Sequence, residues 1–125
     1  MKLENLMAVS AIVAVPYGLA CVFFPEAWMR LWGFELAGQG VMMGRMYGGQ
    51  VFGFGLTSWL ARTSPWSPAK RAMIIGFAVV DTTSCLLASY AVLTGVVGLT
   101  GWIDVGGFAL LAAGFTYFAL RGEAS

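Results

Sequence analysis

The sequence predicts an all-α integral membrane protein, a four-helix bundle with a short interfacial helix between helices one and two, formed by a single domain over residues 1–125. Composition is the first reason: the chain is 59% hydrophobic and only 10% charged, with a mean hydropathy of +0.80. A soluble domain of this size keeps much of its surface in water and could not hide so much apolar area. The second reason is that the apolar residues fall into four stretches, each close to the roughly 20 residues that a spanning helix needs.

Segments that end helices separate these four stretches. The predicted spanning helices are Asn5–Phe24, Val41–Ala61, Ala72–Leu93 and Val105–Leu120. A polar loop with two prolines, Arg62–Arg71, separates the second helix from the third, and proline ends helices. Thr94–Asp104 separates the third helix from the fourth and contains three glycines, which disfavour a helix there.

The segment Pro25–Phe34 is predicted to be a short helix that lies on the outer membrane surface. Proline suits a first helical turn, and Glu26 and Arg30 are four residues apart, so they can pair. Trp28 and Trp32 share the other face, which suits the headgroup boundary. Two roles stay open for this segment: a structural cover over the bundle, or a lid over a pocket that opens outward.

The positive charges predict that both chain ends lie on the cytoplasmic side of an inner or plasma membrane. Cytoplasmic segments of membrane proteins carry an excess of lysine and arginine. With the N-terminus inside, the basic residues on the cytoplasmic side are Lys2, Arg62, Lys70, Arg71 and Arg121. Those on the opposite side are Arg30 and Arg45. The bias therefore favours this orientation over its reverse.

Several kinds of chemistry lack their usual residues. The chain has no histidine, which most catalytic zinc sites, many haem sites and most general bases use. Cys21 and Cys85 are far apart, and each lies in an apolar stretch, so both are predicted to be small buried apolar residues. A net charge of +1 gives no sign of a nucleic-acid surface. The sequence therefore favours a non-catalytic protein, predicts no metal site and leaves any cofactor unknown.

The second predicted helix is rich in glycine. Its predicted helix-packing residues are Gly44, Gly48, Gly49, Gly53 and Gly55. Glycines four residues apart form a groove that lets another backbone approach closely. Gly49 and Gly53 lie off the stripe that the other three form, so we expect this helix to pack on two sides. Its neighbours are then other helices of this chain or a partner subunit.

Four polar residues in the apolar segments are candidate ligand-binding residues: Tyr17, Arg45, Gln50 and Asp81. Asp81 lies near the middle of the third helix, and Gln50 reaches a similar depth on the second. Charged groups inside a membrane are costly and usually functional. Asp81 is therefore either a proton-coupled or ligand-binding carboxylate, or a polar clamp that hydrogen-bonds Gln50. Arg45 lies near the outer end of its helix, where it either pairs with Asp104 or extends to lipid phosphates.

The run FFPEAWMRLWGF, from Phe23 to Phe34, resembles the segment after the first helix in small DoxX-like four-helix membrane proteins. The runs GRMYGG from Gly44 and GFGL from Gly53 are similar to the arginine- and glycine-containing second helix of that grouping. The resemblance covers the first half of the chain. It implies a four-helix membrane fold with Arg45 as the most site-like residue. Some members are linked to quinone-coupled oxidation or assist larger complexes, but no redox motif is present here.

Two hypotheses about function follow. The glycine-rich helix and the scarcity of reactive groups favour a non-catalytic accessory or scaffold subunit that packs against a larger membrane complex or against itself. The alternative is a binding or transport protein for a small lipophilic or quinone-like molecule, because a few polar groups converging in an apolar interior are typical of a ligand pocket. That alternative fails if those side chains lie on different faces or if the interior is solidly packed.

Overall fold

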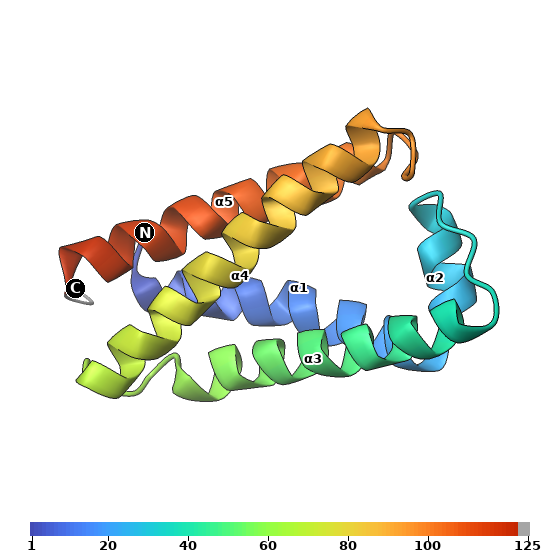
Figure 1. Ribbon diagram of the computed structural model, residues 1–125. Helices are drawn as coiled ribbons and strands as arrows, with labels where there is room; N and C mark the ends of the chain where they lie inside the picture. Colours follow the sequence, from blue (N-terminus) through green and yellow to red (C-terminus); the bar gives the residue numbers. More distant parts are fainter. Residues whose placement is uncertain (123–125) are drawn as a thin grey trace.

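The computed structural model describes residues 1–122 and is built from helices, as the sequence predicts (Figure 1). The helices are α1 (Leu3–Phe23), α2 (Pro25–Leu31), α3 (Gln39–Ala61), α4 (Pro68–Leu93) and α5 (Gly101–Arg121). The long helices alternate in direction. The start of α1 and the end of α5 therefore lie at the same end of the molecule, which we call the terminal end.

Three of the long helices, α1, α4 and α5, are long and apolar enough to cross a membrane. Their outer faces carry large apolar side chains that no other part of the described chain covers. Ile12 on α1, Leu86 on α4 and Leu110 on α5 are 63%, 67% and 77% exposed. So much uncovered apolar surface is unfavourable in water and favourable in lipid. The fold thus indicates a membrane protein, while the spanning role of the glycine-rich α3 stays a prediction.

Two helix starts differ from the sequence-based prediction. Helix α4 begins at Pro68 rather than Ala72, because the Ser67 hydroxyl caps it by accepting a hydrogen bond from the Lys70 backbone N–H. Proline then occupies the first turn, where its missing N–H costs nothing. Helix α5 begins at Gly101 rather than Val105, so the glycine-rich connection is shorter than predicted and Asp104 lies inside the first turn.

The short helix is also shorter than predicted: α2 ends at Leu31 rather than Phe34. The chain turns at Gly33, whose φ of 85° favours glycine. Trp32 therefore lies just beyond the helix instead of continuing its face. Whether α2 lies at a membrane surface stays a prediction.

Helices α1 and α3 pack against each other along most of their length. Their backbones come so close that side chains are excluded: a Cβ on Gly48 would lie 2.5 Å from the Cβ of Cys21. A Cβ on Gly18 would lie equally close to the backbone nitrogen of Phe52. The Ser58 hydroxyl adds a hydrogen bond of 2.9 Å to the carbonyl oxygen of Met7. This pair owes its close packing to small residues, as the glycine pattern predicts.

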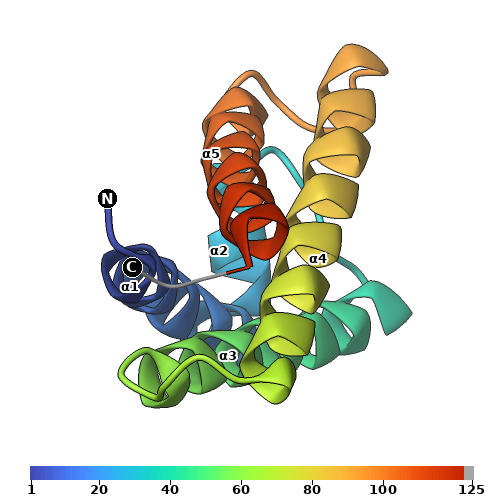
Figure 2. The ribbon, with the colours of Figure 1, turned by 90° about the vertical axis from the view of Figure 1, so that its left-hand side faces the viewer.

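Helices α4 and α5 form a second pair, and the two pairs meet mainly through α1 and α5 (Figure 2). The shared apolar core lies toward the terminal end. Its buried members are Leu3, Leu6, Met7, Ile74, Phe77, Ala78, Phe115, Phe118 and Ala119. The rings of Phe77 and Phe115 meet with centroids 5.3 Å apart. Toward the other end the pairs diverge (Figure 1).

At that other end a small contact joins the pairs again. The Gly98 N–H, in the loop between α4 and α5, donates to the carbonyl oxygen of Trp32 at 3.1 Å. The Thr100 hydroxyl donates to the carbonyl oxygen of Leu31 at the same distance. We call these two hydrogen bonds the latch. The pairs are thus joined at both ends, by a core at one and by the latch at the other.

Candidate ligand-binding cavity

A cavity of about 540 Å³ lies between the two helix pairs, between the core and the latch. All five helices contribute to its wall, which is mostly apolar. Gln50 lines it and is still exposed, which shows that the cavity is partly open. A volume of this size falls in the range of small-molecule sites. The interior of the molecule is therefore hollow rather than solidly packed.

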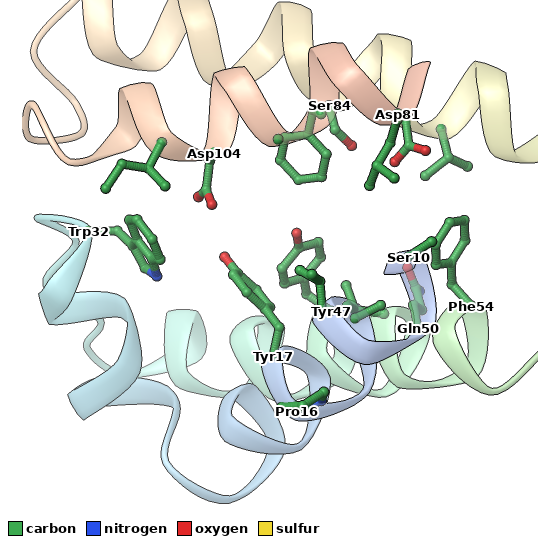
Figure 3. Close-up of a pocket in the computed structure, with 18 of the residues that line it drawn as sticks. Ser10, Pro16, Tyr17, Trp32, Tyr47, Gln50, Phe54, Asp81, Ser84 and Asp104 are labelled. Carbon is green, nitrogen blue, oxygen red and sulfur yellow. The ribbon is translucent and has the colours of Figure 1, made fainter. Parts of the chain in front are cut away.

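The inner part of the cavity, nearest the core, carries Ser10, Gln50 and Asp81 (Figure 3). Asp81 on α4 is 2% exposed, and Ser10 on α1 is 1% exposed. The Oδ2 atom of Asp81 and the hydroxyl of Ser10 are buried without a hydrogen-bond partner among the described residues. Such groups cost free energy when they stay unpaired. The predicted clamp to Gln50 is thus not formed by that Asp81 oxygen.

Four aromatic rings line the part of the cavity nearest the latch, and we call them the aromatic box: Tyr17 on α1, Trp28 on α2, Trp32 just after α2, and Tyr47 on α3. Tyr17 is at its centre: its ring centroid lies 5.2 Å from Trp28 and 6.4 Å from Trp32. The centroid of Tyr47 lies 6.3 Å from that of Tyr17. The indole N–H groups of both tryptophans are buried without a partner among the described residues.

The four buried unpaired side-chain atoms of the described chain are thus in Ser10, Trp28, Trp32 and Asp81, and all four residues line this one cavity. Native proteins usually satisfy nearly all such atoms. All four atoms are enclosed and so lie just behind the cavity surface, and their side chains would have to rotate to reach something placed inside it.

The cavity wall also has a clear charge bias. Asp104, in the first turn of α5, points its carboxyl group into the space above Tyr17 (Figure 3). Asp81 contributes a second carboxyl group further in. Neither lysine nor arginine is among the described residues that form the wall. The cavity therefore offers acids and electron-rich rings without a basic side chain.

The structure brings three of the four candidate ligand-binding residues together. Tyr17, Gln50 and Asp81 line the cavity, while Arg45 is exposed and lies outside its wall. Arg45 also does not share the cavity with Asp104, the partner that its depth suggested. Its exposed side chain agrees with the other alternative, an arginine that extends outward from α3.

Sequence reasoning missed Asp104 and three rings of the aromatic box, Trp28, Trp32 and Tyr47, as cavity residues. One signal was available on α5, where Asp104, Gly107, Phe108 and Leu111 recur at helical spacing and share one face. No comparable signal existed for Trp28 and Trp32. Their assignment to a headgroup boundary followed from amphipathic spacing alone, whereas in the structure both line the cavity.

The five predicted helix-packing glycines have different surroundings. Gly48 and Gly55 touch α1 so closely that a Cβ on either would collide with it. A Cβ on Gly44 would meet the side chain of Leu36. Around Gly49 and Gly53 there is open space within 4 Å. Any packing by these last two requires something other than the described chain.

The next features concern metal ligands and thiol groups. Within residues 1–122, no three histidine, cysteine or acidic side chains are grouped in a way that could hold a metal ion. Both cysteines are free thiols, Cys21 buried and Cys85 half-buried. No protein-family model, no curated protein and no solved structure matches this chain. The DoxX-like resemblance therefore rests on its sequence runs alone.

Proposed function

We propose that this chain is a four-helix membrane protein that binds a small lipophilic molecule in the cavity between its helix pairs. The observation that carries the proposal is that all four buried unpaired polar atoms belong to residues of one partly open, mainly apolar wall. Apolar walls with a few convergent polar groups are typical of small-molecule sites. Rotation of these side chains on binding would let a bound molecule supply the hydrogen-bond partners that the protein itself does not.

In this proposal α3 is the fourth spanning helix, since it lies along α1 and has a similar length. Both chain ends face the cytoplasm, because Lys2, Arg62 and Arg121 then lie on that side. The latch and α2 would face the opposite side. The cavity would lie in the membrane half nearer that side, where a lipophilic molecule can enter from the bilayer between the diverging pairs.

Two glycines on α5 allow a matched test of binding. Gly107 lines the cavity and its neighbour Gly106 does not, and a Cβ on either would meet nothing within 4 Å. Gly107→Leu should fill part of the cavity without a backbone collision, and Gly106→Leu should leave the cavity empty. The measurement is equilibrium dialysis in a non-ionic detergent against protein-free micelles, with duroquinone and benzyltrimethylammonium as probes.

We expect saturable binding of at least one probe to the wild-type protein and to Gly106→Leu, and at least tenfold weaker binding to Gly107→Leu. If neither probe binds, or if Gly107→Leu binds as well as the wild type, the cavity is not a ligand site. Binding of duroquinone alone would support the quinone-like form of the proposal.

The accessory-subunit hypothesis is a second candidate, and one observation favours it. Gly49 and Gly53 on α3 leave open space that no other part of the described chain fills. A partner helix could approach α3 closely there. Crosslinking in intact membranes tests this: a specific adduct lost in Gly49→Leu and Gly53→Leu supports a partner, and an unchanged monomer in wild type and variants contradicts it.

A further inference from the structure

We propose that the molecule bound in the cavity is an organic cation, with an alkylammonium head held between the aromatic box and Asp104 and an apolar body directed toward the core. This inference rests on the proposed function, because it names the class of ligand for the same cavity. The inference rests on three features of the cavity wall: the aromatic box, the facing Asp104 carboxyl group and the lack of basic side chains among the wall residues.

The aromatic box provides the right surface for such a head. Tyr17, Trp28 and Trp32 lie within 5.2–6.4 Å of one another by ring centroid, and Tyr47 adds a fourth ring. The rings meet partly edge to face and partly stacked, so they form one contiguous cluster on the cavity wall, against which the head would lie on the side that faces Asp104. The faces of aromatic rings attract cations, and cages of such rings recognise quaternary ammonium groups.

The distribution of charge makes a cation the preferred occupant. Asp104 and Asp81 are the acids of the wall, and the exposed Arg45 lies outside it. An anion would be repelled by any ionised carboxylate. With a neutral molecule the carboxyl group would be protonated, because unpaired charge is costly in a poorly solvated space, and it would add no charge attraction. A cation removes this cost.

Asp104 alone would not establish a site, because an acid in the first turn of α5 also stabilises the start of a helix. The independent evidence is Asp81, which is 2% exposed, lines the same cavity and has an oxygen without a partner. No helix start explains an acid near the middle of α4. Two acids on two helices, both in one wall, point to a positively charged ligand more directly than either does alone.

An isosteric pair of probes tests the charge of the ligand. Benzyltrimethylammonium and neopentylbenzene have nearly the same shape and differ in whether the branched centre is a positive nitrogen or a neutral carbon. Both are measured by equilibrium dialysis in a non-ionic detergent against protein-free micelles. We expect the wild-type protein to bind the cation at least tenfold more tightly than the neutral isostere, as one cation–π contact and one charge contact together would produce.

The variant Asp104→Asn tests whether this carboxyl group causes the preference for the cation over its neutral isostere. This variant should lose most of the preference for the cation while still binding the neutral isostere, which shows that its cavity is intact. The matched control is Glu35→Gln, which removes an exposed carboxylate between α2 and α3 that is outside the cavity wall and should keep the full preference. Trp32→Leu, which removes one ring of the box, should weaken cation binding more than neutral binding.

The failures of the two proposals are distinguishable. If the neutral isostere binds as tightly as the cation, the ligand class is wrong and the cavity remains a lipophilic site. If the preference persists in both Asp104→Asn and Trp32→Leu, the aromatic box does not hold the charge and the inference is overturned. If neither probe binds to the wild-type protein, both this inference and the lipophilic-ligand site lose their support.

Discussion

The two halves of this molecule are built from the same helices and meet opposite physical requirements. Near the terminal end, Phe115, Ile74 and Met7 are fully buried in a continuous apolar core. Near the latch, the same helix pairs enclose a cavity whose wall carries unpaired polar atoms and two carboxyl groups. The core stabilises the fold, whereas the cavity end holds groups that cost stability until something binds them. This difference is the basis of our proposal that the cavity end binds a ligand.

The largest expected effect separates the core from the cavity wall. Phe115→Ala removes a fully buried ring and should lower the free energy of unfolding by about 3 kcal/mol. Phe108→Ala, on the same helix, removes a half-buried ring in the cavity wall and should lower the free energy of unfolding by less than about 1 kcal/mol. Thermal unfolding in detergent measures both. Equal losses would show that the cavity wall is packed as tightly as the core.

The next effect concerns the glycines of α3. Gly48→Ala would place a Cβ 2.5 Å from that of Cys21 and should cost about 2 kcal/mol, because the backbones of α1 and α3 must separate. Gly49→Ala meets open space and should be neutral or stabilising by up to about 1 kcal/mol, since alanine favours a helix. The same unfolding measurement applies. A larger loss for Gly49→Ala would reveal packing that the described chain does not provide.

The latch should contribute less to the free energy of unfolding than the contact between α1 and α3. Gly33→Ala combines an unfavourable positive φ with a Cβ 2.6 Å from the backbone nitrogen of Gly98, so it should break the latch at a cost of about 2 kcal/mol or less. Gly95→Ala is the control, because it has a positive φ without a neighbour within 4 Å. The excess loss in Gly33→Ala over Gly95→Ala measures the latch. No excess would mean that the latch does not join the pairs in solution.

The smallest effect on stability is expected at Asp81. Asp81→Asn keeps the shape of the side chain and should change the free energy of unfolding by no more than about 0.6 kcal/mol, the average for polar contacts between membrane helices. Asp81→Leu should be neutral or slightly stabilising, because it removes a buried oxygen that has no partner to lose. Detergent unfolding compares the two variants. A loss of several kcal/mol in Asp81→Leu would restore the structural-clamp interpretation.

The sequence predicts the positions of the helices better than it predicts the cavity. The predicted segments matched α1 and α3 to within a few residues, and α1 is long and apolar enough to cross a membrane. Depth along the helices also brought Tyr17, Gln50 and Asp81 together as candidates. The cavity itself follows from the divergence of two helix pairs, which no local pattern encodes. That is why the sequence suggested Asp104 only as a partner for Arg45 and placed the two tryptophans at a membrane surface.

Arg45 also shows that the sequence does not predict which residues line the cavity. It was the residue favoured by the DoxX-like resemblance, and the structure places its exposed side chain outside the cavity wall. Depth in the membrane can be read from the sequence, but the rotation of a helix about its axis depends on its neighbours. Here the close approach of Gly48 and Gly55 to α1 fixes that rotation.

We propose that the unfilled cavity lowers the stability of the free protein and serves ligand binding. Thermal unfolding of Gly107→Leu, with and without a cation, tests this proposal. Gly107 lies in open space in the cavity wall, so leucine should raise the unfolding temperature of the free protein by filling the cavity and favouring the helix. Added benzyltrimethylammonium should stabilise the wild-type protein by about 2.7 kcal/mol at 100 times its Kd, and should stabilise Gly107→Leu by about 1.4 kcal/mol or less at the same concentration. A variant that is less stable than the wild type, or that the cation still stabilises fully, would contradict the account.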